Sequence, residues 1–283
     1  MTEWLDWPSY RRLVALLRSP DGGAAEVGAL AATDLADFVE ALSRYAPDAF
    51  PGAIESIARE IVARQPAVAP LVALANAVCL AIDGGPGTVA AEARGFQKRL
   101  TSSVEILSTV GAALIPEGGS VLTHGASSSV RGALVAASEK GVRVVCVASA
   151  LDEGRRMAAD LNAAGVPVEV VAEAMVPDAL YAVDLVMVGA NALGPDAAVT
   201  VAGTGTLAKE ASNVGVRVIV LASADKALAA ALFDRAAESA TAAATLEVVR
   251  LGAFDSVVTE LGVLDGAGAR RLAEGKVVAA QLG

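Results

Sequence analysis

The stretch that decides the fold is GGSVLTHGASSSVRG, residues 118–132. It predicts a buried strand over 121–123, a sharp polar turn containing His124, and a helix that opens with Ser127, Ser128 and Ser129. A helix start leaves N–H groups without partners and carries partial positive charge, so a phosphate is a natural guest there. Plain capping by serine is the simpler alternative for this stretch.

Upstream of this stretch, residues 1–116 predict a helical N-terminal domain. Apolar residues recur at helical spacing, and glycine and proline clusters such as Pro20-Asp21-Gly22-Gly23 separate the segments. Thr33-Asp34 predicts a helix start. The expected helices cover a first segment that starts at Trp7-Pro8 and runs to Leu17, and then 33–45, 54–63, 71–82 and 88–114. The 71–82 segment has few polar positions and is therefore expected to be buried.

Downstream, the pattern changes to short β-branched runs that alternate with helical segments. The expected strands are 121–123, 142–148, 168–171, 185–188, 216–221 and 246–250, and the expected helices are 127–140, 153–164, 203–214 and 225–238. Apolar strands separated by helices predict a parallel sheet covered on both faces. Residues 117–283 therefore predict a Rossmann-like, doubly wound α/β domain. Its ligand is expected at the carboxyl ends of the strands, near His124, Ser149, Asn191 and the 223–226 turn.

Composition limits the classes of function. The 283 residues carry a formal net charge of −10, with 54% hydrophobic and 19% charged residues. Excess negative charge argues against binding to a nucleic-acid backbone or an anionic membrane. The two cysteines, Cys79 and Cys146, lie in apolar runs and predict buried thiols, not a disulfide or metal pair. No signal pattern or membrane-spanning run is evident, so we expect a cytoplasmic protein.

Other helix starts offer further phosphate candidates. Gly203-Thr204-Gly205-Thr206-Leu207-Ala208 formally matches the dinucleotide fingerprint G-x-G-x-x-A, but only a short apolar run precedes it. A dinucleotide-binding oxidoreductase is therefore one hypothesis, and a single-phosphate site or simple capping is another. Arg155 and Lys226 follow strand ends and are either phosphate ligands or ordinary surface cations. One histidine and two apolar cysteines exclude an ordinary zinc site and a histidine-based triad, and no cofactor is implied.

Several motifs together resemble one family. IPEGGSVLTH (115–124), EGR (153–155), VDLVMVGA (183–190), GT with LA (203–208), and FD followed by TELGVL (254–264) resemble, in order and spacing, the initiation factor 2B alpha/beta/delta superfamily. That superfamily includes ribose-1,5-bisphosphate and methylthioribose-1-phosphate isomerases. The resemblance implies a helical domain joined to a Rossmann-like domain, a homodimer or larger oligomer, and a phosphorylated small molecule as ligand.

Departures from the family pattern bear on catalysis. The isomerases have a cysteine after the TH pair and an aspartate after VGA, whereas this chain has Gly125 and Asn191. Glycine has no side chain, and an amide is no general acid or base near neutral pH. The family's strand-end Glu-Ser-Arg-Pro becomes residues 147–150, and its lysine before the GT pair becomes Val201. The remaining candidates for binding an anion are His124, Ser127, Ser128, Ser129, Arg155, Gly203, Thr204, Thr206 and Lys226.

Two main readings follow. In the first, the chain is a non-catalytic regulatory or scaffold protein that binds a sugar phosphate or nucleotide as an effector. In the second, it is an enzyme on a phosphorylated sugar, an aldose–ketose isomerase in the first instance, with His124 as acid/base assisted by Asn191 and Ser127. A purely structural role for His124, as an ordering element of its turn, stays open.

Overall fold

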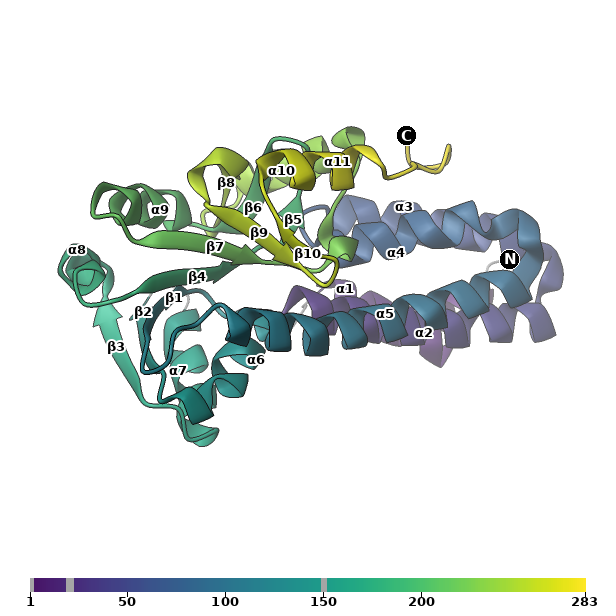
Figure 1. Ribbon diagram of the computed structural model, residues 1–283. Coiled ribbons are helices and arrows are strands. Elements are labelled where there is room, and N and C mark those ends of the chain that lie inside the picture. The colour runs from purple at the N-terminus through teal and green to yellow at the C-terminus, as the bar shows by residue number, and fades with distance from the viewer. Residues whose placement is uncertain (1–2, 19–22, 149–151) are drawn as a thin grey trace.

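The computed structural model describes residues 3–18, 23–148 and 152–283. Figure 1 shows an elongated molecule with a helical part at one end and an α/β part at the other, joined by one long helix. The helical part contains α1 (Pro8–Arg18), α2 (Ala24–Tyr45), α3 (Phe50–Arg64), α4 (Ala69–Leu80) and α5 (Gly85–Ala113). Short 3-10 turns lie at Glu3–Asp6, Pro47–Ala49 and Ile82–Gly84. The helical expectation for the N-terminal third is confirmed.

The prediction of a helix start at Thr33-Asp34 is wrong, because α2 begins nine residues earlier, at Ala24. Thr33 turns its hydroxyl back to the carbonyl of Ala29 at 3.1 Å, a mid-helix bond that competes with capping. Asp34 instead pairs with Arg12 of α1 at 2.6 Å. Residues of good capping type therefore lie in the middle of this helix, and Asp34 contributes to its contact with α1.

The α/β part is built on seven strands in the order β10-β9-β7-β4-β1-β2-β3. All neighbours are parallel except β9 and β10, which form an antiparallel pair at one edge. The strands are β1 (Ser120–His124), β2 (Arg143–Ala148), β3 (Val168–Ala172), β4 (Leu185–Gly189), β7 (Arg217–Leu221), β9 (Ser256–Thr259) and β10 (Gly262–Leu264). The mostly parallel sheet confirms the expected α/β class.

Helices cover both faces of this sheet, as its two-sided apolar strands require. One face packs against α6 (Ser128–Ala136), α7 (Glu153–Ala163) and the end of α5, and the other against α8 (Val176–Leu180), α9 (Thr204–Asn213) and α11 (Gly266–Glu274). Alternate residues of a strand serve the two cores: Val121 faces the α5–α6–α7 side, and Leu122 faces the α8–α9 side. The buried Cys146 belongs to the first core, and burial raises the pKa of its thiol to about 12.

A second, smaller sheet corrects one prediction. Residues 246–250 form β8 (Leu246–Arg250), but β8 pairs antiparallel with β6 (Ala197–Val201), which also pairs with β5 (Ala192–Leu193). The expected membership of 246–250 in the parallel sheet is therefore wrong. The helix expected at 225–238 is α10 (Ala230–Ala242), and it begins later because Ala224–Lys226 forms a separate 3-10 turn.

The largest core crosses from the helical part into the α/β part. It joins residues of α2 to α5, such as Phe38 and Leu74, to Phe233 of α10 and Leu282 near the carboxyl end. The predicted division at residues 116 and 117 falls in the loop between α5 and β1. Because the core spans that division, two separately folding domains remain a prediction.

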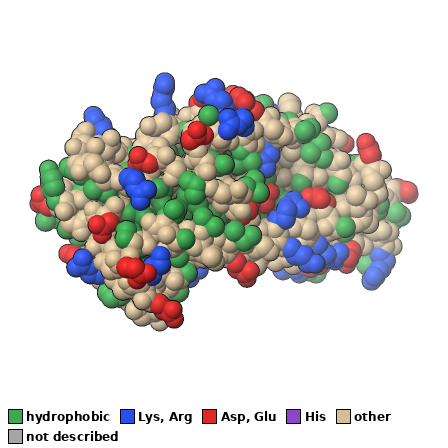
Figure 2. All heavy atoms as spheres, viewed as in Figure 1, with side chains coloured by type: hydrophobic (Ala, Val, Ile, Leu, Met, Phe, Trp, Pro, Cys, Tyr) green, Lys and Arg blue, Asp and Glu red, His purple; other side chains and the backbone are tan. Residues whose placement is uncertain are grey.

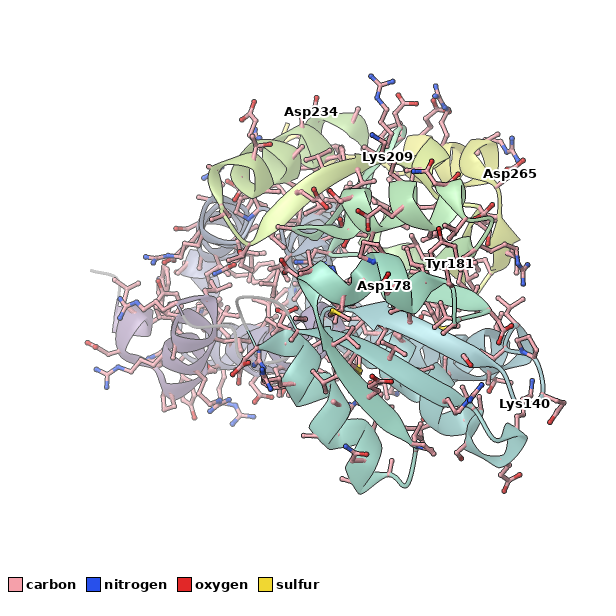
Figure 3. The ribbon with its side chains drawn as sticks, turned by 90° about the vertical axis from the view of Figure 1, so that its left-hand side faces the viewer. Lys140, Asp178, Tyr181, Lys209, Asp234 and Asp265 are labelled. Carbon is pink, nitrogen blue, oxygen red and sulfur yellow. The ribbon has the colours of Figure 1, made fainter. Side chains whose placement is uncertain are left out.

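The surface carries both signs of charge. Figure 2 shows acidic and basic side chains intermingled across one face, and Figure 3 shows Tyr181, 79% exposed, at the surface beyond α8. Over the described ranges, no single helix meets the length and apolarity of a membrane span. The segments Ala69–Leu80 and Ile82–Ala113 meet them only as a pair bent by 48°.

Candidate functional site

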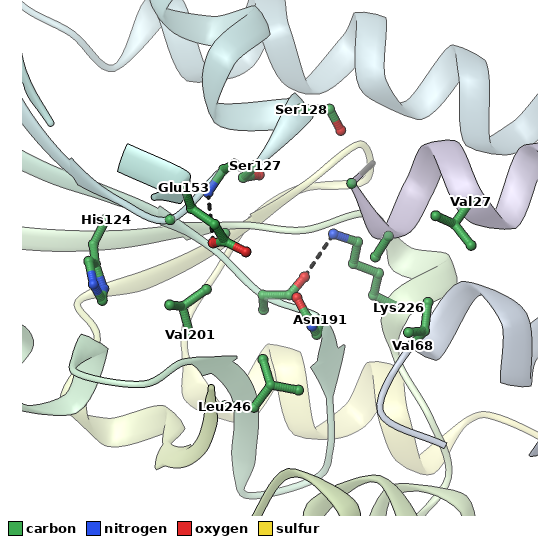
Figure 4. A pocket seen from close by; sticks show the side chains of 16 residues that line it. Val27, Val68, His124, Ser127, Ser128, Glu153, Asn191, Val201, Lys226 and Leu246 are labelled. Carbon is green, nitrogen blue, oxygen red and sulfur yellow. Dashed lines mark hydrogen bonds between the residues drawn. The ribbon is translucent and has the colours of Figure 1, made fainter. Parts of the chain in front are cut away.

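A cavity of about 190 Å³ opens at the carboxyl ends of β1 and β4. These strands are neighbours, and the chain proceeds from them toward opposite edges of the sheet, so the cavity sits at the switch point where open α/β sheets bind ligands. The helical part closes the other side (Figure 4). The lining comprises Gly23, Ala24, Val27, Val68, His124, Gly125, Ala126, Ser127, Ser128, Glu153, Gly189, Ala190, Asn191, Val201, Lys226 and Leu246.

The turn between β1 and α6 forms one wall. Gly125 has a φ of +81°, a conformation that side chains disfavour. Ser127 caps α6, its hydroxyl accepting a bond from the N–H of Val130 at 3.4 Å. Gly189 at the end of β4 lets this turn approach, because a Cβ there would lie 2.5 Å from that of Ser127. The predicted strand–turn–helix unit is confirmed, and it exposes Ser127 and Ser128 to the cavity.

Glu153, the first residue of α7, reaches across to the same turn. Its Oε2 accepts a hydrogen bond from the N–H of Ala126 at 3.2 Å. Gly154 permits this position because a Cβ on it would lie 1.9 Å from the carbonyl oxygen of Val147. The carboxylate thus lies against the turn at the start of α6, the part of the cavity where an incoming anion was expected.

Lys226 supplies the cation of the cavity. It is 5% exposed, and its Nζ donates to the carbonyl of Ala190 at 2.7 Å. Within the described part of the chain it forms no salt bridge. Burial lowers the pKa of this amine to about 8. Glu260 fixes the turn that carries it, its two oxygens accepting from the N–H of Ala224 at 3.1 and 2.9 Å.

Asn191 enters the cavity from the segment after β4. Its backbone is held from two sides: its N–H donates to Val199 at 2.7 Å, and its carbonyl accepts from Ala69 at 3.1 Å. These bonds tie β4, the small sheet and the start of α4 together. The amide side chain therefore stands on a rigid support at the position where isomerases are expected to carry an aspartate.

His124 lies between two cavities. It lines the first and also a neighbouring cavity of about 320 Å³, together with Glu173, Glu210 and mostly apolar residues. Its Nδ1 lies 3.3 Å from the hydroxyl of Thr204, which itself donates to the carbonyl of Val201 at 2.7 Å. Because the Thr204 hydroxyl donates its proton to Val201, its oxygen is left to accept a hydrogen bond from His124. This favours the imidazole tautomer that carries its proton on Nδ1. Burial lowers the pKa of His124, against the opposing effect of Glu173, Glu153 and Glu247.

The start of α9 is arranged differently from the turn before α6, and a phosphate site there stays a prediction. The N–H of Gly205 already donates to Oε1 of Glu247 at 2.7 Å. Gly203 and Thr206 line the neighbouring cavity instead. The strand before this turn is β6, part of the antiparallel sheet, so the strand–helix–strand context of a dinucleotide fingerprint is missing.

Three other sequence candidates lie elsewhere. Arg155 is exposed on α7 and pairs with Asp152 at 3.1 Å. Ser129 is buried and is not part of the cavity lining. Ser149 lies outside the described residues. In the described ranges, no group of three histidine, cysteine, aspartate or glutamate side chains is arranged to hold a metal ion.

An adjoining polar cavity of about 190 Å³ was not predicted from the sequence. It shares Ser127, Ser128 and Glu153 with the first cavity and adds Arg131 and Arg156. Arg131 lies 3.4 Å from Glu26 of α2 and 3.4 Å from Asp160 of α7. An extended ligand could span both spaces. A helical spacing of three between Ser128 and Arg131 was the signal available in the sequence.

The chain is similar to known proteins over most of its length. A family model described as the initiation factor 2 subunit family matches residues 22–265. A ribose 1,5-bisphosphate isomerase from Haloterrigena turkmenica is 31% identical over 212 residues, which cover 71% of this chain and 64% of the relative. The chain thus spans less than two thirds of that relative's length.

Solved structures show the same fold. The translation initiation factor eIF-2B of Pyrococcus horikoshii OT3 superposes with a TM-score of 0.76 at 23% identity, covering 89% of this chain and 96% of the other. The 5-methylthioribose 1-phosphate isomerase of the same organism gives 0.70 at 18%, covering 95% and 88%. A tetrameric eIF2B-beta2-delta2 complex from C. thermophilum gives 0.74 at 17%, covering 94% and 93%. With the family match extending over most of its length, this chain belongs to the initiation factor 2 subunit family.

Proposed function

We propose that this protein binds a phosphorylated sugar or nucleotide in the cavity at the ends of β1 and β4, as a non-catalytic regulatory or scaffold member of its family. The observation that carries the proposal is the lining of that cavity. It keeps a helix start, hydroxyl groups and a buried lysine, while the expected thiol and carboxylate positions are Gly125 and Asn191. Binding groups without the acid–base pair favour recognition over turnover.

The lining favours one orientation of the ligand. Its phosphate meets the start of α6, where Ser127 and Ser128 line the cavity and the helix end is partially positive. Glu153 then either gives up its hydrogen bond from the N–H of Ala126, so that this N–H can bind the phosphate, or accepts a hydrogen bond from a ligand hydroxyl. The sugar extends toward Asn191 and Lys226, which present amide and amine groups from the far side (Figure 4).

The alternative function is a sugar-phosphate isomerase with relocated groups. Its supports are the 31% identity to a ribose 1,5-bisphosphate isomerase and a histidine in the cavity wall. The lowered pKa of His124 leaves it neutral near pH 7 and therefore a base. Its bond to Thr204 and its burial suit a structural role equally well, so turnover has to be measured directly.

Two further expectations accompany the proposal. We infer a homodimer or larger oligomer in the cytoplasm, an inference supported by the tetrameric assembly named for one structural relative. Size-exclusion chromatography with light scattering measures the assembly state. No contact with nucleic acid is proposed, because the net charge of −10 opposes it.

The test is thermal unfolding of the purified protein with ribose 5-phosphate, ribose 1,5-bisphosphate, AMP and NAD. A ligand at about one hundred times its dissociation constant adds about 2.7 kcal/mol to folding stability. We expect a shift with a phosphorylated pentose or a mononucleotide, lost in Ser128→Ala and Lys226→Met and kept in Ser102→Ala, an exposed serine of α5.

Turnover of the bound ligand then separates the two functions. Aldose–ketose interconversion followed by NMR should be absent if the chain is a binding protein. Interconversion that disappears in His124→Asn would establish the isomerase instead. No shift with any phosphate would refute the proposed ligand site altogether.

A further inference from the structure

The geometry of the cavity points to a covalent role for Lys226. We propose that its Nζ forms a reversible imine with the aldehyde of an open-chain sugar phosphate bound there. This inference rests on the proposed ligand class and adds the chemistry that holds the ligand.

The first support is the position of the nitrogen. Nζ lies inside the cavity wall, on a side chain that is 5% exposed, and among the described residues its hydrogen bond runs to the carbonyl of Ala190 at 2.7 Å. A neutral amine satisfies that carbonyl with one N–H and keeps its lone pair. In Figure 4, Lys226 enters the cavity from the side opposite His124, beside Asn191. The lone pair therefore has access to the carbonyl carbon of a ligand in this space.

The second support is the missing counter-charge. Through the described part of the chain, no carboxylate pairs with this nitrogen, whereas arginines on the surface pair freely with acidic residues. A buried ammonium without a partner is costly, so burial shifts the equilibrium toward the neutral amine relative to an exposed lysine. Burial lowers the pKa to about 8, which gives this lysine about a hundredfold larger neutral fraction near neutral pH than an ordinary lysine has.

The third support is the set of polar side chains that line the cavity around the reaction path. Asn191 and the serines at the start of α6 line the same space, and their amide and hydroxyl groups can donate hydrogen bonds to a carbonyl oxygen of a ligand bound there. Glu153, also in the lining, places a carboxylate beside the same space. A carbonyl polarised on its oxygen is more open to attack at carbon.

The reaction balances without another reactant. The lone pair of Nζ attacks the aldehyde carbon, the C=O π electrons move to oxygen, and a proton passes from nitrogen to that oxygen. The carbinolamine then loses its hydroxyl group with a proton as water and leaves a C=N bond. No oxidation or reduction occurs, and hydrolysis returns the aldehyde and the free amine.

The experiment traps the adduct. The whole protein is incubated with ribose 5-phosphate and sodium cyanoborohydride, which reduces imines to stable secondary amines. Intact-mass and peptide mass spectrometry locate the label among the five lysines, Lys98, Lys140, Lys209, Lys226 and Lys276. Lys140 is the matched internal control, because its Nζ also donates to backbone carbonyls, at 2.8 and 2.9 Å, but lies outside the cavity.

We expect a single addition at Lys226, about tenfold or more faster than at the other four lysines. Its mass equals the sugar phosphate less one oxygen atom. Ribitol 5-phosphate, which has no carbonyl, should raise the unfolding temperature and suppress labelling in the same concentration range. Lys226→Arg, which keeps a cation but forms no such imine, should abolish the addition. Because the site is mapped in the unaltered protein, the result does not depend on that variant folding.

Two outcomes would overturn the inference. If ribitol 5-phosphate stabilises the protein while Lys226 is labelled no faster than Lys140, the covalent role is wrong and the proposed binding function stands. If neither sugar phosphate stabilises the protein and labelling is unselective, both the inference and the proposed function fail.

Discussion

Replacing Lys226 by methionine should change how folding stability depends on pH. In the folded protein the amine is buried with one carbonyl partner, and its pKa falls from 10.5 to about 8. In the unfolded chain the amine is exposed to water and keeps its ordinary pKa. Methionine fills a similar volume without a titrating group, so the difference between wild type and variant reports this one amine.

The magnitude follows from that difference in pKa. A tenfold change in proton affinity corresponds to about 1.4 kcal/mol, so a fall from 10.5 to about 8 corresponds to about 3 kcal/mol. Between these two values the unfolded chain binds more protons than the folded protein, and the free energy of unfolding therefore rises with pH. The wild type should gain about 3 kcal/mol relative to Lys226→Met as the pH rises through this window.

Urea unfolding at several pH values measures the effect. The variant also leaves the carbonyl of Ala190 without its partner, which costs about 1–3 kcal/mol at every pH. This cost lowers the free energy of unfolding by a constant amount and does not change its dependence on pH. Lys140→Met provides the control for removing a lysine bound to backbone carbonyls elsewhere. A constant difference between wild type and Lys226→Met from neutral pH to about pH 10 would refute the burial argument.

Two further predictions concern the walls of the cavity. Gly154→Ala should destabilise the protein by about 1–3 kcal/mol in urea unfolding, because the new Cβ would lie 1.9 Å from the carbonyl oxygen of Val147. Gly252→Ala is the control, because its Cβ would meet nothing within 4 Å. Equal urea midpoints for the two variants would contradict the close packing at Gly154. Burial lowers the pKa of His124, so the unfolded chain takes up a proton at a higher pH than the folded protein does. The wild type should therefore lose stability relative to His124→Asn as the pH falls from neutral toward about 5. If the unfolding free energies of the two proteins run parallel over this pH range, the imidazole is not desolvated.

Much of the α/β part could be predicted from the sequence. The change of pattern at residue 120 marks the first strand of the parallel sheet, and four further strands of that sheet lie within two residues of their expected places. Apolar β-branched runs bounded by turns are strong local signals. The strand at 246–250 was also found, but its sheet was not, because pairing with β6 depends on contacts far away in the sequence.

The site was predictable at the level of its elements and not of its contacts. Ser127 and Ser128 line the cavity because strand, turn and helix are locally encoded. Arg155, on the next helix start, points to solvent and pairs with Asp152, and no local pattern distinguishes the two cases. The burial of Lys226 follows from how α4, the small sheet and the 224–226 turn pack, which is a property of the assembled fold. The hydrogen bond from the N–H of Gly205 to Glu247 also joins residues far apart in the sequence, so no local pattern predicts it.

The glycine at position 125 has a consequence for how this lineage can change. Its φ of +81° would strain a cysteine by about 1–3 kcal/mol, and a Cβ there would lie 2.9 Å from Cγ2 of Val201 and 3.2 Å from Oε2 of Glu153. A thiol introduced by Gly125→Cys alone would therefore stand in a strained turn, in close contact with Val201 and Glu153. A substitution that makes Val201 smaller would have to accompany it, so a cysteine at this position requires at least two coordinated changes.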